Sequence, residues 1–292
     1  MDSLGDRMKA MEAVFEQQIS PYNPYIIRLD GKNFSKFTKG FKKPFDIYFA
    51  NAMVETMNDL VNKYNAVTGY THSDEITLIF KSACTKEEYD SEESNSCHCF
   101  NGRVIKLCSV ISGYCSVRFA HHLQNIMTFY ANELPNEYST SFIHRIEQAD
   151  YCFDARPLEF SYEKPGEIVN HMIWRSIHDC QRNAISTYAH NKFGHKKMKG
   201  LDGRQMIEAM GEVGLDWDKD VTLFWKHGIY AKKELYILKT NHKGEEIECT
   251  RQRIVNKMFK ITYSEEILEV LLGKYWPAPE ILNELQIEDF VG

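Results

Sequence analysis

The chain has 292 residues, a mass of 34.1 kDa, 43% hydrophobic residues and a formal net charge of −6. This length suits one large domain or two small ones, and the apolar content is enough for a packed core. An acidic chain is not a general binder of nucleic acid, so any RNA-binding surface must be built from segregated basic residues.

Cysteine usage and the first residues indicate the compartment. The eight cysteines form no disulfide framework, which predicts reduced thiols in a cytosolic protein. No stretch approaches about 18 consecutive apolar residues, so we expect no membrane span. The N-terminal residues lack a secretory apolar core and include acids that transit peptides avoid. A mitochondrial location stays open for a longer form of the chain. Cys97-His98-Cys99 is too tightly spaced for a zinc site with two arms.

Apolar periodicity predicts six elements in the first half: a helix over residues 3–18, a strand over 24–30, a helix over 45–64, a hairpin over 67–80, a helix over 102–123 and a fourth strand closing at 152–154. Strand-helix-strand-strand-helix-strand is the ferredoxin-like order, so we expect an α+β fold with an antiparallel sheet. The acidic stretch 85–96 is predicted to be a solvated loop.

The second half is predicted to be mixed but mostly helical. Helices are expected over 166–190 and 203–213, with a strand at 235–238, a turn at 241–244 and an acidic tail from residue 264. We therefore divide the chain into residues 1–160 and residues 161–292. Basic residues are densest in the loop near Lys196 and Lys197, where RNA phosphate contact and a plain solvated loop are both open interpretations.

Two short segments each present a carboxylate at the end of a strand. Alternation puts Arg28 and Asp30 on one strand face, and Asp74 follows Ser73 in a tight hairpin between two strand-like runs. Carboxylates that converge from adjacent strands suit a two-metal phosphoryl-transfer site, because Mg²⁺ prefers oxygen ligands. Asp-Gly and Ser-Asp are also ordinary turn sequences, so surface turns remain the alternative. Glu75 either helps a metal or only orients the hairpin.

Several motifs together resemble the tRNA-histidine guanylyltransferase family, whose members are 3′–5′ nucleotide-adding polymerases with a polymerase-like palm. The resemblance covers about residues 2–240. Each motif is weak alone, but their order is specific. The matching segments are residues 4–9, Asp30 to Phe34, Lys43 to Asp46, Ser73 to Glu75, residues 100–106, residues 153–156 and Trp174-Arg175.

One departure from the family pattern is informative. Enzymes that guanylylate tRNA-histidine carry His-Ile-Asn-Asn-Leu-Tyr-Asn after Trp-Arg. This chain has Cys-Gln-Arg-Asn-Ala-Ile-Ser over residues 180–186, which keeps only Asn183. The pattern is more similar to the Thg1-like branch, whose members extend or repair truncated RNA 5′ ends against a template strand.

The resemblance implies a Mg²⁺-dependent nucleotidyltransferase that activates and extends the 5′ end of tRNA under template direction. ATP and GTP or other nucleoside triphosphates would be substrates, and a homotetramer built as a dimer of dimers would be the assembly. A dedicated tRNA-histidine guanylyltransferase is the nearer alternative. A non-catalytic RNA-binding relative is the further one, which intact Asp30 and Asp74 argue against.

The resemblance also implies residue roles, each with a structural alternative. Asp30, Asp74 and the carbonyl of Gly31 would hold two Mg²⁺ ions, with Asp30, Asp74 and Glu75 as the catalytic residues. The remaining residues would bind nucleotides: Arg28, Gly31, Lys32, Asn33 and Phe34 at the first turn, Lys43 and Asp46 at the long helix, Ser73 in the hairpin, Arg103 and Lys106 as a triphosphate clamp, and Asn183 in the second half. The alternatives are an Arg28–Asp30 ion pair, a helix cap at Asp46, a solvated face at Arg103 and Lys106, and helix–helix hydrogen bonds at Asn183.

Overall fold

A computed structural model describes residues 3–133, 137–242 and 245–290. The described chain contains one seven-stranded sheet with the strand order β4-β1-β3-β2-β5-β6-β7. The first half follows the ferredoxin-like order, which confirms the predicted fold class. Its elements are β1 (Tyr25–Gly31), α3 (Ile47–Tyr64), β2 (Thr68–His72), β3 (Glu75–Phe80), α5 (Val104–Glu133) and β4 (Phe153–Glu159).

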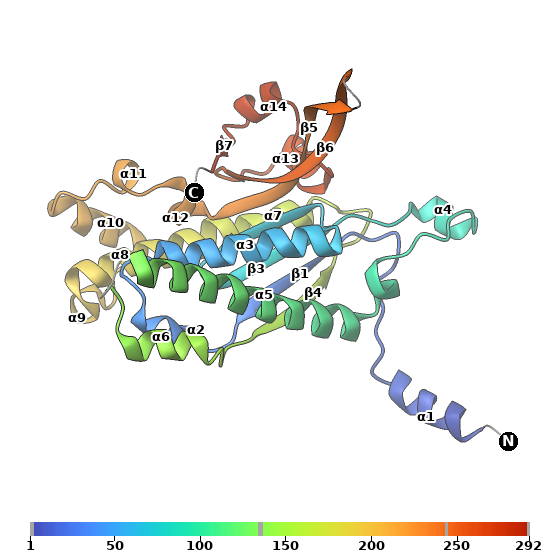
Figure 1. The fold of residues 1–292 in the computed structure, drawn as a ribbon, viewed down its shortest axis with the longest axis horizontal. Helices are drawn as coiled ribbons and strands as arrows, with labels where there is room; N and C mark the ends of the chain where they lie inside the picture. Colours follow the sequence, from blue (N-terminus) through green and yellow to red (C-terminus); the bar gives the residue numbers. More distant parts are fainter. Residues whose placement is uncertain (1–2, 134–136, 243–244, 291–292) are drawn as a thin grey trace.

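Helices α3 and α5 cover one face of this sheet (Figure 1). The predicted apolar stripe of α3 is buried, including Met53, Met57 and Leu60. Along α5 the fully buried positions recur every fourth residue, from Leu107 to Leu123. Both stripes face the sheet, as expected for helices that bury one side. Smaller elements complete this half: α1 (Leu4–Ala13), α2 (Phe34–Phe37), η1 (Thr38–Gly40), α4 (Lys86–Asp90), η2 (Cys99–Gly102) and α6 (Thr140–Glu147).

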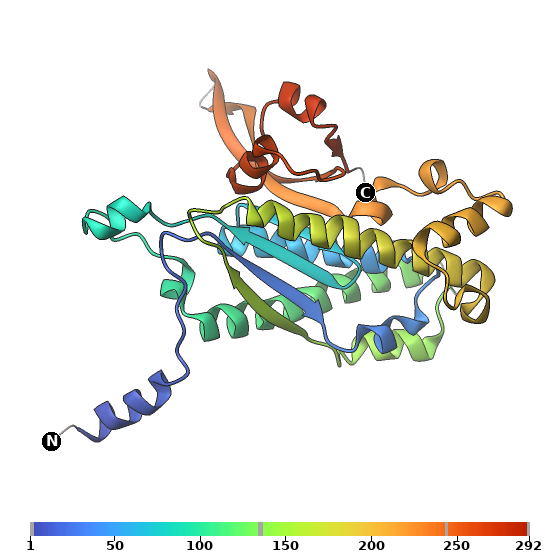
Figure 2. The same ribbon diagram turned by 180° about the vertical axis from the view of Figure 1, so that it is seen from behind.

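A second helical layer crosses the opposite face of the sheet (Figure 2). It consists of α7 (Glu167–Ile173), the π-helical segment η3 (Trp174–Cys180) and α8 (Gln181–Phe193). Ile168, Val169 and Met172 of α7 are buried in the cluster that contains the sheet residues Ile26 and Tyr70. The helix therefore covers the β2–β3 side of this face and leaves β4 uncovered.

The second half continues the same sheet, because β5 pairs with β2 between Ala231 and Gly69. The boundary proposed at residue 160 falls in the connection between β4 and α7. None of the described helices is both long and apolar enough for a membrane crossing. The other elements are α9 (His195–Met198), α10 (Gly203–Glu212), α11 (Trp217–Asp220), α12 (Leu223–His227), β5 (Ile229–His242), β6 (Glu245–Met258), α13 (Glu265–Leu272), α14 (Pro279–Glu284) and β7 (Glu288–Asp289).

Several predicted boundaries differ from the structure. Helix α1 ends at Ala13, and it projects from the body with its apolar stripe exposed; Phe15 just beyond it is 76% exposed. The fourth strand begins at Phe153 instead of closing there. Helix α5 begins at Val104, because Gly102 has a positive φ of 70° that an α-helix cannot contain. The acidic stretch contains α4, and the turn predicted at 241–244 lies partly outside the described residues.

Candidate active site

Four carboxylates gather where β1 ends. In the antiparallel register, Asp30 on β1 lies opposite Glu75 on β3 and opposite Asp154 on β4. Asp74 occupies the turn that precedes β3, and the N–H of Gly31 donates to its carbonyl oxygen at 3.1 Å. Residues opposite one another across a sheet have neighbouring side chains. The structure thus brings the predicted metal ligands Asp30, Gly31 and Asp74 together, and adds Asp154.

The two predicted metal-binding carboxylates influence each other electrostatically. Burial raises the pKa of Asp74, and the neighbouring Asp30 charge raises the pKa further. Ser73, which has a positive φ of 49°, donates its hydroxyl to Asp74 at 3.1 Å. Two adjacent carboxylates with unfavourable mutual charge are a donor set that a divalent cation stabilises.

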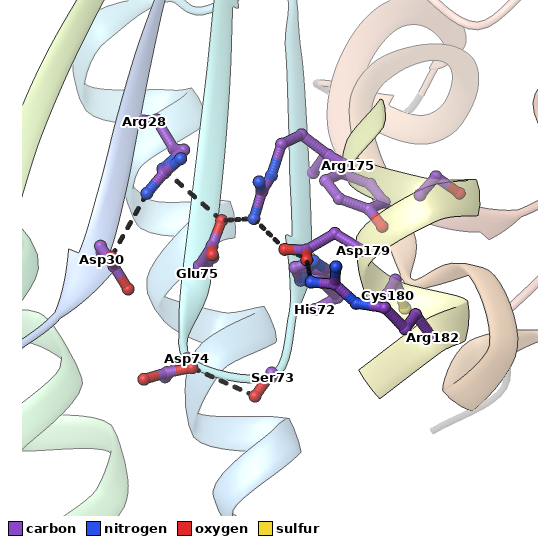
Figure 3. A network of polar contacts seen from close by, with 12 residues as sticks. Arg28, Asp30, His72, Ser73, Asp74, Glu75, Arg175, Asp179, Cys180 and Arg182 are labelled. Atoms are coloured by element: carbon purple, nitrogen blue, oxygen red, sulfur yellow. Dashed lines mark hydrogen bonds and ion pairs between the residues drawn. The ribbon is translucent and has the colours of Figure 1, made fainter. Parts of the chain in front are cut away.

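Beside these carboxylates runs a network of arginines and acids (Figure 3). Arg28 contacts Asp30 at 3.3 Å and Glu75 at 3.6 Å. Arg175, which is buried on η3, bonds Glu75 and also bonds Asp179 at 2.5 Å. Glu75 therefore links β1 to the helical layer through two arginines. Such contacts would orient the hairpin, which is one of the two roles that the sequence left open for Glu75.

Buried His72 stands close to the same network. Burial raises the pKa of Glu75 to about 7 and lowers the pKa of His72 to about 3. Ligand atoms of His72, Glu75 and Asp179 lie within 4.8 Å of one another, a spacing that could hold a metal ion. The guanidinium of Arg175 bonds both Glu75 and Asp179, so the positive charge that a metal ion would supply to these acids is supplied by the arginine.

A cavity of about 210 Å³ opens beside the β2–β3 turn. It is bounded by the 38–53 segment, the end of β2, α8 and α12, and its lining includes Lys43, Asp46, Ser73 and Asn183. Four of the predicted nucleotide-binding residues therefore share one cavity. Part of its wall is aromatic, because Phe45 stacks on Trp225 with ring centroids 4.5 Å apart, and both line the cavity.

Asp46 is largely occupied by structural contacts. It is buried, it caps α3 by accepting from the N–H groups of Tyr48 and Phe49, and it also accepts from the N–H of Lys42. The hydroxyl of Tyr138 donates to the same carboxylate at 2.6 Å. The helix-cap role is thus present, and a nucleotide would have to compete with these donors.

The first turn is partly occupied as well. The N–H of Gly31 donates to Asp74, and the N–H of Lys32 donates to the Cys152 carbonyl at 2.9 Å. A phosphate at this turn would therefore be contacted by the N–H groups of Asn33 and Phe34, at the start of α2. The ring of Phe34 packs against Gly31, where any Cβ would meet it at 2.5 Å.

Arg103 and Lys106 lie far from the carboxylates within the chain. Arg103 directly precedes α5, where its backbone forms a β-bridge with Gln18. Farther along α5, the hydroxyl of Ser116 accepts from the N–H of Phe153, which pairs with Gly31 in the sheet. The helical segment between Arg103 and Ser116 is about 20 Å long at 1.5 Å per residue. The structure does not bring this predicted clamp to the site of the same chain.

Sequence reasoning left three residues of the site without a role. Asp154 and Arg156 belong to a matched family motif, and strand alternation could have placed them on the face of Asp30 and Arg28. Arg175 was also in a motif, but its partner Glu75 is 100 positions away. No local sequence pattern predicts a contact over such a separation.

Known proteins are similar to this chain over much of its length. A family model described as tRNAHis guanylyltransferase matches residues 5–160. Protein R259 of Acanthamoeba polyphaga mimivirus is 41% identical over 290 residues, which is 99% of this chain and 95% of that protein. The tRNA(His) guanylyltransferase of Debaryomyces hansenii is 25% identical and covers 89% of this chain and 92% of its own length.

Solved structures are similar over most of the chain. A bacterial tRNA(His) guanylyltransferase-like protein in complex with ATP has a TM-score of 0.62 and 27% identity, covering 86% of this chain and 91% of its own. The complex of such a protein with GTP has a TM-score of 0.60 and 26% identity, covering 87% and 91%. Because the family model matches more than half of the chain and a relative with 41% identity spans nearly all of it, this chain belongs to the tRNAHis guanylyltransferase family of nucleotidyltransferases.

Proposed function

We propose that the protein extends the 5′ end of tRNA in the 3′–5′ direction, adding nucleotides that pair with the opposite strand. The observation that carries this proposal is the position of Asp30 and Asp74, which stand together at the strand ends next to a cavity lined by Lys43 and Asn183. Carboxylates beside a site for a triphosphate are the arrangement that phosphoryl transfer requires.

Mg²⁺ fits the residues present. Asp30, Asp74 and the Gly31 carbonyl supply hard oxygen donors, and a dication would relieve the repulsion that raises the pKa of Asp74. When bound, two Mg²⁺ ions would supply Lewis-acid stabilisation of the attacking and leaving oxygens. Glu75 would keep both ligand-bearing strand ends in place through Arg28 and Arg175.

The chain's own side chains would orient two phosphoryl transfers. In the first, an oxygen of the RNA 5′-monophosphate attacks the α-phosphorus of ATP or GTP, and pyrophosphate leaves. In the second, the 3′-hydroxyl of an incoming nucleoside triphosphate attacks the activated 5′ phosphorus, and the nucleoside monophosphate leaves. Lys43 would contact the triphosphate as a point charge, and Asn183 would hydrogen-bond the base against the Phe45–Trp225 wall.

The proposal includes a cytosolic location and a homotetramer built as a dimer of dimers. Arg103 and Lys106 then have a role only if the assembly brings the beginning of a second copy's α5 to the site, because within one chain they lie far from Asp30.

The direct test uses a labelled, 5′-monophosphorylated tRNA that lacks its first nucleotide. With Mg²⁺ and nucleoside triphosphates we expect a product that is one nucleotide longer, and we expect a chelator or Asp30→Ala to abolish it. A wild-type protein that binds this RNA and the nucleotides but yields no longer product would contradict the proposal and favour a non-catalytic relative.

A further inference from the structure

The segment that joins α8 to α9 carries an exposed group of positive charges. We call this segment the basic turn, and its exposed cations are Lys192, Lys196, Lys197 and Lys199. From residue 180 to residue 201 the sequence contains no aspartate or glutamate, although the whole chain has 41 acidic residues against 35 lysines and arginines. Positive charge is therefore segregated at this turn in an otherwise acidic protein.

The lysines of the basic turn lack acidic partners. Within the described part of the chain, none of the four takes part in an ion pair, whereas the exposed Lys219 and Lys239 pair with carboxylates at 3.0 Å and 3.2 Å. Like charges that stand close together repel one another. A polyanion bound at the turn would relieve this repulsion.

The basic turn is anchored by packing. The structure contains the short helix α9 where the sequence predicted a loop. Met198 of α9 is buried in a cluster with Met206 and Trp217, and Gly194, with a positive φ of 79°, redirects the chain from α8 into α9. The turn is therefore a platform that presents its charges in defined positions.

Helix α8 connects the basic turn to the candidate active site. Asn183 lines the cavity near the start of this helix, and Lys192 comes nine positions later, about 14 Å along the axis at 1.5 Å per residue. Between them, Tyr188 packs against the cavity residue Phe45 with ring centroids 5.3 Å apart. Figure 1 and Figure 2 both show α9 at the end of the molecule where β1 leads into α2.

We propose that the basic turn binds backbone phosphates of the paired RNA next to the reacting 5′ end. This inference rests on the proposed function and adds a binding surface to it. An RNA 5′ end held at Asp30 and Asp74 has its paired stem outside the cavity, at the end of the molecule where the basic turn lies.

The chemistry of the basic turn suits RNA phosphates. Lysine is a mobile point charge that contacts phosphates without reading the bases. Binding that ignores sequence is what a template-directed enzyme requires, because base pairing selects the nucleotide. The turn lies outside the cavity, so a nucleoside triphosphate inside it would be contacted by Lys43 and not by these lysines.

The test measures how tightly Lys196→Gln combined with Lys197→Gln binds two 5′-monophosphorylated RNAs. One is the truncated tRNA, and the other is a short RNA hairpin that keeps only its terminal stem. The double variant should bind both RNAs about tenfold more weakly at about 0.1 M salt. Its slope of log affinity against log salt should be shallower by about 1.8, since each phosphate contact in a duplex contributes about 0.9. The KM for the RNA should rise, whereas the KM for the nucleoside triphosphate should not change.

The matched control is Lys81→Gln combined with Lys164→Gln, which removes the same charge from two other exposed lysines. These lysines follow the ends of β3 and β4 that pair with Tyr25, whereas Asp30 lies at the opposite end of β1. The control variant should keep the affinity and the salt slope of the wild type. Chemical unfolding of both double variants should match the wild type, because all four substituted lysines are exposed.

Wild-type affinity and salt slope in the Lys196→Gln and Lys197→Gln variant would overturn the inference while the proposed function stands. Weaker binding of the tRNA with unchanged binding of the hairpin would also overturn it, because the turn would then contact a distant part of the tRNA. A change in oligomeric state alone would show a contact with an acidic surface of a second copy, and the inference would again be wrong. A wild-type protein that neither binds nor extends the RNA overturns the proposed function itself.

Discussion

Adjacent residues of the β2–β3 turn face different surroundings. Asp74 lies beside Asp30, and its charge is disfavoured by burial and by that neighbour. Glu75 points into a pair of arginines, Arg28 and Arg175, whose charges offset part of the burial that raises its pKa to about 7. We therefore expect Asp74 to matter for chemistry and Glu75 for the position of the strand ends.

Asp74→Asn should leave the fold intact and abolish extension. Because the folded state disfavours the Asp74 charge, its removal should not lower the free energy of unfolding. Glu75→Ala should lower that free energy by about 1–3 kcal/mol, since it removes the carboxylate oxygens that the buried Arg175 bonds and that Arg28 contacts. Denaturant unfolding and single-turnover extension measure the two effects, with Asp90→Asn on the exposed α4 as control. Full activity of Asp74→Asn would exclude it as a metal ligand.

Arg175→Met should be strongly destabilising. It leaves the half-buried Glu75 and Asp179 without their shared partner, a loss of about 3–5 kcal/mol. Arg182→Met removes the other arginine bonded to Asp179, but that side chain is 71% exposed, so less than about 1 kcal/mol is expected. If Arg175→Met and Arg182→Met changed the free energy of unfolding equally, the contacts of Arg175 would not be what holds the helix on the sheet.

Among the elements, β5 holds the two halves of the chain in one sheet. Beyond its pairing with β2, it carries the fully buried Lys232. The Lys232 ammonium donates to the Val67 carbonyl at 2.9 Å, to the Thr68 hydroxyl at 2.8 Å and to the Gly273 carbonyl after α13. A lysine at this position joins three segments by hydrogen bonds that an apolar residue cannot make.

Lys232→Met should lower the free energy of unfolding by about 2–4 kcal/mol, because it orphans buried carbonyl oxygens. Lys239→Met on the same strand removes an exposed lysine that pairs with Glu248 at 3.2 Å, and should change stability by less than about 1 kcal/mol. Urea titration of both variants checks the difference. If Lys232→Met were as stable as the wild type, the free-energy cost of burying the ammonium would equal the stabilisation from its hydrogen bonds.

Elements whose apolar face packs into the core of the same chain could be predicted from the sequence. The stripe of α3 and the β2–β3 hairpin appear where the sequence places them, because local periodicity matches the core they fill. The stripe of α1 was equally clear, yet it is exposed. Periodicity identifies an apolar face but not what covers it. Spacing likewise put Arg103 and Lys106 together without revealing at which end of the sheet they lie.

The candidate site was predictable only in part. Asp30 and Asp74 could be paired because both stand at strand ends, where topology brings them together. Arg175 depends on a contact across 100 positions, and Asp154 on the register of β4, whose start was misplaced. The Arg175 contact follows from tertiary packing that no local pattern encodes, whereas Asp154 could have been placed by strand alternation once the bounds of β4 were known.

At the scale of the whole molecule, the buried residue His227 lies at the contact between the two halves. His227 is the buried last residue of α12, and its carbonyl accepts from the Tyr70 hydroxyl at 2.9 Å and from the Ser176 hydroxyl at 2.8 Å. Burial, assisted by the charge of Lys260, lowers the pKa of the His227 imidazole to about 4. The backbone carbonyl of His227 thus bonds both helix and sheet, and the folded protein holds its buried ring neutral.

Stability should therefore fall in mild acid. Between pH 6.5 and pH 4 the unfolded state binds a proton at His227 that the folded state does not, so the free energy of unfolding decreases as the pH falls through this window. At pH 5 the loss from this residue is about 2 kcal/mol. His227→Gln should flatten the pH profile of chemical unfolding, whereas His144→Gln, which changes an exposed ring, should not. Identical profiles for wild type and His227→Gln would contradict this assignment.

The central claim is that the opposite strand, and not a fixed preference for guanylate, selects the added nucleotide. It is tested most directly by incorporation on 5′-monophosphorylated tRNAs lacking the first nucleotide, with Mg²⁺, all four triphosphates, and a template position of C, G, U or A. The account predicts G, C, A and U respectively, with yields that depend on pairing and not on tRNA identity. Addition of G alone, and only to tRNA-histidine, would contradict it and show that the sequence at Cys180 to Ser186 still supports dedicated guanylylation.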